Sequence, residues 1–127
     1  MVTIVTSGAA VVAVWRFQRQ EPLPSLPDAL ARARKQLIRA ARARDASLQL
    51  IRSKLVTVAR ARAIEVDAIE RIRGQVRRVR STHVFAFGAE LVLEEYAPVD
   101  LFHAVDHAVF SPLKRSLLLT PTAPAPA

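Results

Sequence analysis

The chain has 127 residues, a formal net charge of +8 and no cysteine. At about 100–200 residues per domain, this length allows no more than one domain. The lack of cysteine excludes a disulfide scaffold, a zinc ribbon and a cysteine nucleophile. With only 3 glycines, the chain is also too short and too glycine-poor for a complete dinucleotide-binding fold or an eight-stranded α/β barrel.

The positive charge is concentrated in one segment. Residues 28–80 carry 15 basic and 5 acidic side chains, whereas residues 81–127 carry 2 basic and 5 acidic ones. Nearly all of the basic residues are arginines, which grip carboxylates or phosphates with a planar fork. A large positive field attracts nucleic acid, anionic membranes or acidic proteins. The alternative is that the arginines only solvate an exposed helix.

The N-terminus is apolar, since Met1–Trp15 contains no charged side chain. A membrane-spanning helix needs about 17–25 apolar residues, so the stretch is just short of that range. We expect a hydrophobic, membrane-inserted helix over residues 1–19, with Trp15 and Arg16 at the membrane interface. The alternatives are a β-hairpin turning at Ser7-Gly8, an import signal, and an apolar plug in a partner protein.

A proline-rich linker over residues 20–27 separates this anchor from a helix. Ser25 and Asp28 have the spacing of a helix capping box. From Asp28 to Arg80 the chain has no proline and a single glycine, Gly74. Because good helix formers dominate here, we predict one long basic helix over residues 28–80.

Apolar residues in the second half of this helix follow a 3-4-3 spacing, which is typical of a coiled-coil seam. Arg62 interrupts the seam once. An amphipathic helix of this length must bury its stripe against a partner. The residues predicted to pack are Leu48, Ile51, Leu55, Val58, Ile69, Ile72 and Val76.

Residues 81–119 are expected to form a small C-terminal helical cap. Val84–Tyr96 fits either a buried helix or two short strands around Gly88-Ala89, and we favour the helix. A short helix is predicted over Val99–Phe110, and residues 120–127 form a Pro/Ala tail. The predicted fold class is therefore mainly α.

The candidate chemistry is weak. His103 and His107 lie one helical turn apart, but Ala104 occupies the position where a zinc protease needs glutamate. We therefore predict no metal site. Glu90, Glu94, Glu95 and Asp100 have no defined cleft, and no serine lies in a nucleophile elbow. The sequence accordingly predicts a protein that is not an enzyme and that needs no cofactor.

These features favour an accessory or structural subunit of a larger membrane-bound complex, located for example at an organellar inner membrane such as that of the mitochondrion. Its partners would be other protein subunits and anionic lipid. The alternative is a basic structural protein that binds nucleic acid, as a ribosomal or virion component does. The residues expected to contact an anionic partner are Arg32, Arg34, Arg39, Arg42, Arg71, Arg73, Arg77 and Arg78.

Overall fold

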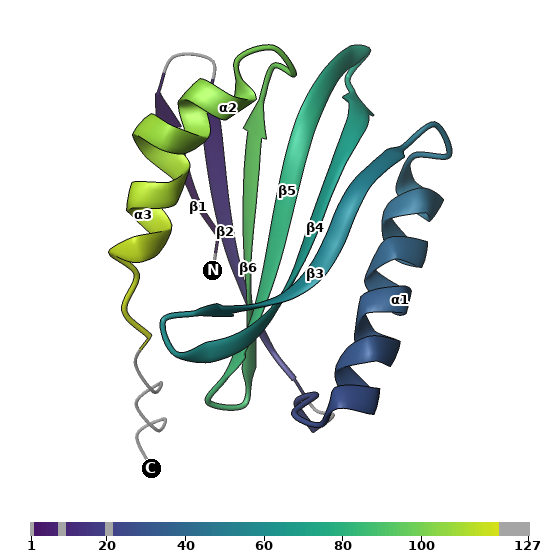
Figure 1. Cartoon of the computed structure of the whole chain (residues 1–127), viewed down its shortest axis with the longest axis vertical. Helices are drawn as coiled ribbons and strands as arrows, with labels where there is room; N and C mark the ends of the chain where they lie inside the picture. The colour runs from purple at the N-terminus through teal and green to yellow at the C-terminus, as the bar shows by residue number, and fades with distance from the viewer. Residues whose placement is uncertain (1, 8–9, 20–21, 120–127) are drawn as a thin grey trace.

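Six antiparallel strands form a single sheet in the computed structural model, which describes residues 2–7, 10–19 and 22–119. The strands are β1 (Val2–Ser7), β2 (Ala10–Gln18), β3 (Gln49–Val58), β4 (Ala61–Ile72), β5 (Gln75–Ala86) and β6 (Ala89–Ala97). The helices are α1 (Pro27–Arg44), α2 (Phe102–Val105), the π-helical turn η1 (Asp106–Phe110) and α3 (Ser111–Arg115). The strand order is β1-β2-β6-β5-β4-β3 (Figure 1).

Strands β3 to β6 form a meander joined by three tight turns. In every turn both central residues have positive φ, which matches the twist of a two-residue hairpin. The turns are Ala59-Arg60, Arg73-Gly74 and Phe87-Gly88. Gly74 and Gly88 therefore reverse the chain between strands rather than interrupting a helix.

The predicted N-terminal membrane helix is wrong, because β1 and β2 pair as antiparallel strands. β2 also pairs with β6, so that Val14 lies opposite Leu93. Val12 and Ala13 point to opposite faces of the sheet and are only 2% and 3% exposed. The first half of β2 is thus buried on both faces and is rich in the β-branched residues that favour this setting. Among the described residues, no helix is long and apolar enough to cross a membrane.

The hairpin alternative for this segment is confirmed by the pairing of β1 with β2. The turn itself, at residues 8 and 9, lies outside the described residues. Trp15 and Arg16, predicted to lie at a membrane interface, instead belong to β2.

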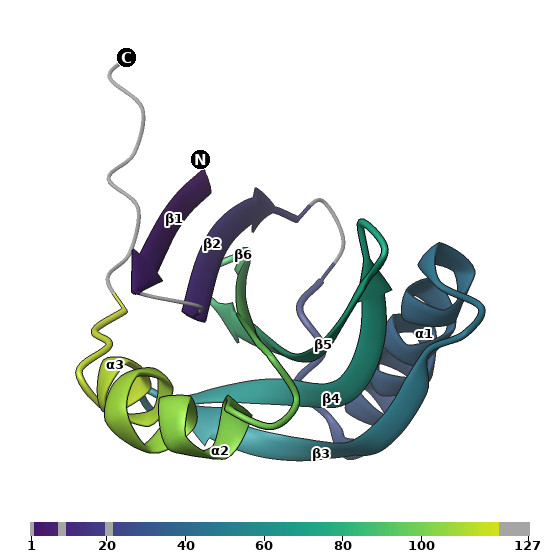
Figure 2. The same cartoon turned by 90° about the horizontal axis from the view of Figure 1, so that it is seen from above.

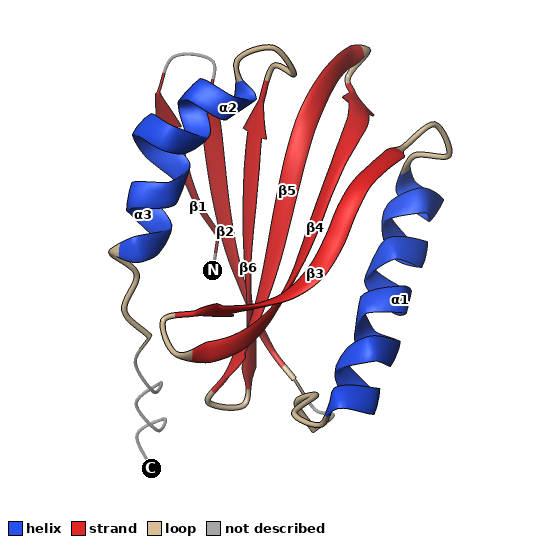
Figure 3. Ribbon diagram, in the orientation of Figure 1, coloured by secondary structure: helices blue, strands red, loops and turns tan. Residues whose placement is uncertain are grey.

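The long helix predicted over residues 28–80 is also wrong. α1 starts where it was expected but ends at Arg44, and β3, β4 and most of β5 occupy the rest of the range (Figure 3). The capping box is not formed, since the N-cap is Leu26 and no side chain caps the helix. The alternating side chains of β4 explain the error: Ile64, Val66 and Ala68 face α1, while Glu65 and Asp67 are buried on the other face.

The coiled-coil seam does not exist, because its residues lie on strands or loops that point in different directions. Ile51, Leu55 and Val76 are 43%, 48% and 52% exposed, whereas Val58 is buried. Ile69 and Ile72 lie on β4, and Leu48 precedes β3. A 3-4-3 spacing over strands does not create one continuous apolar face, since side chains alternate with a period of two.

α1 covers the β3–β5 half of one face of the sheet. Leu30, which is 1% exposed, anchors this layer. Its neighbours on the sheet are Ile64, Val66 and Phe85.

The C-terminal helical segment, residues 102–115, packs on the opposite face. Phe102 and Phe110 are 1% and 0% exposed, and their rings lie 5.5 Å apart. They pack against Ala10, Val12 and Ala97. Figure 2 shows the curved sheet with α1 and this segment at its two sides.

The C-terminal cap is therefore only partly helical. The end of β5 and all of β6 are strands, so the two-strand alternative around Gly88-Ala89 is the correct one. The predicted helix over Val99–Phe110 corresponds to α2 and η1, and it continues through α3. Pro112 has no N–H to donate, and the π-helical turn directly precedes it. The Pro/Ala tail lies outside the described residues.

Two isoleucines distinguish this sheet from the predicted coiled coil. Ile64 is 0% exposed, whereas the seam residue Ile51 is 43% exposed. We expect Ile64→Ala to lower the free energy of unfolding by about 2–5 kcal/mol, because it opens a cavity in the core. Ile51→Ala should cost less than about 1 kcal/mol. Urea denaturation measures both, and a larger loss at Ile51 than at Ile64 would contradict the fold.

Candidate functional site

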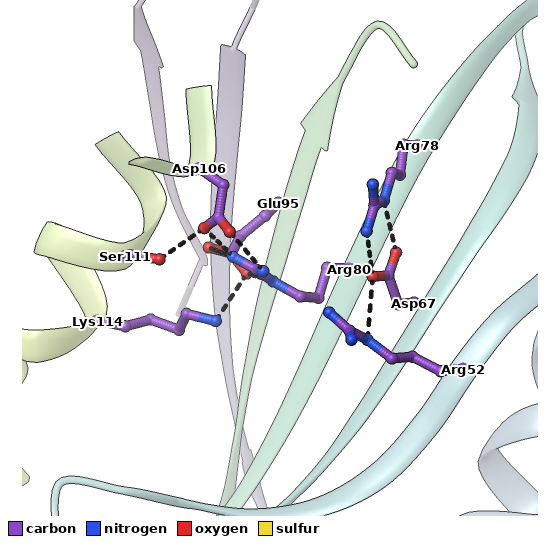
Figure 4. Close-up of polar contacts among 8 residues, drawn as sticks. All are labelled: Arg52, Asp67, Arg78, Arg80, Glu95, Asp106, Ser111 and Lys114. Carbon is purple, nitrogen blue, oxygen red and sulfur yellow. Dashed lines mark hydrogen bonds and ion pairs between the residues drawn. The ribbon is translucent and has the colours of Figure 1, made fainter. Parts of the chain in front are cut away.

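A row of charged side chains crosses four strands on the face that carries the C-terminal helical segment. Strand register places Arg52 opposite Asp67, Asp67 opposite Arg80, and Arg80 opposite Glu95. Directly opposed side chains in an antiparallel sheet lie close enough to interact. The row therefore alternates in sign from β3 to β6 (Figure 4).

Arg80 is the centre of this row. Its Nε and Nη2 donate to the two carboxylate oxygens of Glu95 at 2.8 and 3.1 Å. Its Nη2 and Nη1 donate to Asp106 of η1 at 2.5 and 3.1 Å. The side chains of Arg80 and Glu95 are 6% and 1% exposed. One guanidinium thus satisfies two carboxylates through paired, charge-assisted bonds and joins the sheet to the C-terminal helical segment.

Two further residues of α3 complete this group. Ser111 Oγ donates to Asp106 at 2.8 Å, and Lys114 Nζ lies 3.3 Å from Glu95 Oε1. The hydrogen bonds from Arg80 lower the pKa of Asp106 to about 2. Burial on its own would lower the pKa of Arg80, but its bonds to Asp106 and Glu95 raise it. Asp106 and Arg80 therefore stay charged near neutral pH, so neither is suited to exchange protons.

The neighbouring carboxylate, Asp67, is bound by a second arginine. It is 0% exposed and accepts bonds from Arg78 Nε and Nη2 at 3.0 and 2.7 Å. The guanidiniums of Arg78 and Arg80 lie 4.4 and 5.3 Å from the ring centroid of Phe102. Cation–π contacts of this kind add to the attachment of the helical segment. Arg78 was predicted to meet an external anion, but here it is engaged within the chain.

Because most carboxylates are buried or half-buried, the fully exposed charges are nearly all positive. Among the described residues, the fully exposed acidic side chains are Asp28 and Asp100 and five more are half-buried, whereas thirteen basic side chains are exposed. The exposed basic residues are Arg16, Arg32, Lys35, Arg39, Arg42, Arg44, Arg52, Lys54, Arg60, Arg62, Arg71, Arg73 and Arg115. The surface is consequently more cationic than a net charge of +8 conveys.

The arginines predicted to contact an anion occupy two places. Arg32, Arg39 and Arg42 lie exposed on α1, and Arg34 is half-buried there. The second group surrounds the β4–β5 turn, with Arg71 and Arg73 exposed. Arg77 of this group is half-buried, and its Nη2 donates to Gln75. The two places adjoin, because the carboxylate of Asp45, which follows α1, accepts a bond from the backbone N–H of Arg71 at 2.9 Å.

A cavity of about 490 Å³ opens where α1 meets this turn. We call it the hairpin-end cavity. It is lined by Trp15, Arg44, Asp45, Glu70, Arg71, Ile72, Arg73, Glu94 and Tyr96. Trp15 was assigned to a membrane interface from sequence, but it is a wall of this cavity. Two aromatic rings from β2 and β6 therefore meet three arginines from α1 and the β4–β5 hairpin.

The cavity is also lined by three half-buried carboxylates, those of Asp45, Glu70 and Glu94. Arg44 Nη2 lies 3.8 Å from Glu70, and the hydroxyl of Tyr96 donates to Glu94. Burial raises the pKa of Glu70 and also the pKa of Glu94. Arg71 and Arg73 form no ion pair within the described part of the chain. The cavity thus combines unpaired cations with aromatic surface and carboxylate hydrogen-bond acceptors.

The remaining sequence candidates do not form a catalytic group. His103 and His107 are exposed, and the nearby Asp106 is occupied by Arg80. Within residues 2–7, 10–19 and 22–119, no three histidine, aspartate or glutamate side chains gather to hold a metal.

The acidic candidates are similarly dispersed. Glu90 accepts a bond from Arg19 at 2.6 Å and lies 3.0 Å from Nδ1 of His83, and its pKa is lowered by the bond to His83. Glu94 is half-buried in the hairpin-end cavity, Glu95 is bound by Arg80, and Asp100 is exposed.

Sequence reasoning missed both the buried row and the aromatic side of the cavity. A signal for the row was present: Arg78 and Arg80 are spaced by two residues, as are Glu65 and Asp67. Such spacing places like charges on one face of a strand, where a neighbouring strand of opposite sign can pair with them.

No known protein family matches the sequence, and no curated protein matches it. The structure is similar to PA94 of Pseudomonas aeruginosa, a protein of unknown function described as a putative regulator, with a TM-score of 0.76 and 16% identity over 96% of this chain and 85% of that one. It is also similar to PsbP (CyanoP) of Synechocystis, with a TM-score of 0.58 and 9% identity over 80% of this chain and 63% of that one. At these identities the likeness establishes the fold alone.

Removing the central arginine should strongly destabilise the protein. Arg80→Ala leaves Glu95 and Asp106 without their main counter-ion, and breaking a buried pair in this way costs about 3–5 kcal/mol. Arg62→Ala, on the neighbouring strand but exposed, is the control and should change stability by less than about 0.5 kcal/mol. Thermal or urea unfolding gives both values. Equal losses in the two variants would show that the row contributes nothing specific.

Acid should remove the contribution of Asp106. Its pKa is about 2 in the folded chain against an ordinary value of 3.8, so its contribution is complete above about pH 5 and is lost as the pH falls toward 2. Asp106→Asn should therefore lower the free energy of unfolding by up to about 2 kcal/mol at pH 7 and by much less at pH 2.5.

The exposed Asp100→Asn is the matched control and should show no such pH dependence. Urea denaturation at the two pH values supplies the comparison. A gap between Asp106→Asn and the parent chain that stays constant with pH would refute the assignment.

Proposed function

We propose that this protein is a non-enzymatic accessory subunit that docks on an acidic segment of a partner protein within a larger assembly. The observation that carries the proposal is the separation of charge: the acidic side chains are mostly turned inward, and thirteen basic ones are exposed. Such a surface steers acidic partners toward it and speeds their association. Arginine suits this role, because its fork binds carboxylates through two parallel bonds.

The hairpin-end cavity is the proposed centre of docking. Arg71 and Arg73 have no internal ion pair among the described residues and are available to a partner's carboxylates. Trp15, Tyr96 and Ile72 offer the apolar contact that anchors one side chain of a partner. Asp45, Glu70 and Glu94 disfavour any anion inside the cavity, so the partner's carboxylates bind Arg71 and Arg73, while these three carboxylates accept hydrogen bonds from peptide N–H groups.

One observation favours the alternative of nucleic-acid binding. The arginine-rich segment has no aromatic residue of its own, but the fold brings Trp15 and Tyr96 beside Arg71 and Arg73. Aromatic rings next to arginines are the usual means of stacking single-stranded bases. Three carboxylates line the same cavity and can accept hydrogen bonds from peptide N–H groups, which a phosphate backbone does not offer, so nucleic-acid binding is the second candidate.

The location of the assembly is a separate part of the proposal. A membrane surface suits the exposed arginines, because anionic lipid head groups attract them. Insertion of the N-terminus is not part of it, since β1 and β2 are integral to the sheet.

The single tryptophan makes this proposal directly testable. Trp15 is the only tryptophan in the chain and lines the hairpin-end cavity, so its fluorescence reports binding there. We expect a short Asp/Glu-rich peptide containing one Phe to change this fluorescence at saturable concentrations. The double variant Arg71→Glu/Arg73→Glu should weaken binding at least about tenfold, which is 1.4 kcal/mol.

The pair Arg60→Glu/Arg62→Glu is the matched control. Like the first pair, it changes one turn residue with positive φ and one exposed strand residue, but at the other end of β4. It should leave binding nearly unchanged. Tighter binding of an oligo-dT strand than of the peptide would establish the nucleic-acid alternative instead. If neither probe changed the fluorescence, both functions would be rejected.

A further inference from the structure

A second cavity lies on the face of the sheet opposite α1, between the β3–β4 hairpin and α3. Its volume is about 430 Å³. Val56 and Val58 of the hairpin form an apolar wall, and α3 contributes Lys114 and Arg115. Figure 1 shows the hairpin curling toward α3 at the lower left. The cavity shares no residue with the hairpin-end cavity, so it is a separate site.

One buried carboxylate, Glu65 of β4, faces this cavity. The residue is 6% exposed, and among the described residues its carboxylate has no hydrogen bond and no ion pair. Asp67 and Glu95 are buried to a similar degree, and each is bound by an arginine. Taking a carboxylate out of water without a counter-ion is costly. Glu65 therefore lacks the cation that the other two possess.

The side chains on either side of Glu65 do not supply that cation. Lys54 lies opposite it on β3, but its side chain is exposed and forms no ion pair with Glu65. Thr82 lies opposite it on β5, is 0% exposed, and its Oγ1 has no hydrogen-bond partner. Thr82 does not line the cavity, so Glu65 is the unpaired polar group that a ligand in the cavity can reach. A group with several N–H donors would bind its carboxylate.

The positive charges across the cavity are not equivalent. Lys114 Nζ is already held by Glu95 at 3.3 Å. Arg115 is exposed and forms no ion pair within the described residues. Arg115 is therefore the cation that remains available at the rim, and a ligand's carboxylate is the group that it would bind.

We propose that this cavity binds a small organic ammonium compound with an aliphatic body, and that it prefers a zwitterion. The ammonium group is the counter-ion of Glu65 and donates to its carboxylate oxygens. Val56 and Val58 contact the methylene chain, and Arg115 takes the carboxylate at the other end. This binding site is independent of the docking surface proposed above.

Three six-carbon probes separate the contributions of the ammonium and carboxylate groups: 6-aminohexanoate, hexylammonium and hexanoate. With the full ¹⁵N-labelled chain, we expect the first two to shift the backbone amide signals of Glu65, Thr82 and Ala59, and hexanoate to leave them unchanged. Glu65→Gln keeps the shape of the side chain and should weaken the binding of both amines at least about tenfold. Arg115→Gln should weaken 6-aminohexanoate but not hexylammonium. Asp28→Asn, an exposed carboxylate on α1, is the control and should change neither.

Several results would overturn the proposal. One is failure of all three probes to shift these signals, and another is binding of hexanoate as tight as that of the amines. A ligand-free measurement gives a further check: Glu65→Gln should unfold at the same or a higher urea concentration, because it removes an unpaired buried charge. A loss of stability in both Glu65→Gln and Lys54→Met would show that Lys54 is the counter-ion in solution, and the site would then be closed to an external cation.

Discussion

The pairing of Arg80 with two carboxylates is the interaction on which the rest of the structure depends. Glu95 belongs to the sheet and Asp106 to the C-terminal helical segment, so a single guanidinium connects the two layers. Glu95 is buried, and without this guanidinium only Lys114 would oppose the cost of its desolvation. Phe102 packs beneath the same guanidinium and places an aromatic ring of the segment against β5 and β6. The polar and apolar contacts therefore specify the same position for residues 102–115.

This internal use of carboxylates also determines the outer surface. An acidic side chain that pairs inside the molecule does not offset the arginines on the surface, so the exposed charges are mostly positive. An acidic partner then supplies the negative charge that this surface lacks. Glu65 is the exception inside, as a buried carboxylate for which the chain provides no arginine. The two proposed sites thus have related origins. The surface has an excess of cations, and one buried carboxylate has no counter-ion.

Local features such as helix starts were predictable from sequence, whereas contacts between distant segments were not. Pro27 and the residues that follow it begin a helix as expected, and the helix predicted over Val99–Phe110 was found, although it continues to Arg115, because its apolar positions follow the helical period. β4 and β5 were mistaken for helix because Asp67 and Arg80 occupy interior positions where alternating apolar residues would normally reveal a strand. The hairpin-end cavity joins Trp15 to Arg71 and Arg73 from distant parts of the chain. Only the topology brings these residues together, so no local motif contains them.

The strand order has a consequence for how this chain is made. Val14 of β2 pairs with Leu93 of β6, 79 positions later, so the N-terminal hairpin has no sheet to join until almost the entire meander has been synthesised. At about 5–20 residues per second, this interval lasts several seconds. Throughout it, β2 is without β6, and β1 is its one other partner in the sheet. During synthesis, the N-terminal hairpin is therefore the part of the molecule most exposed to aggregation and to capture by chaperones, and its insertion beside β6 completes the sheet.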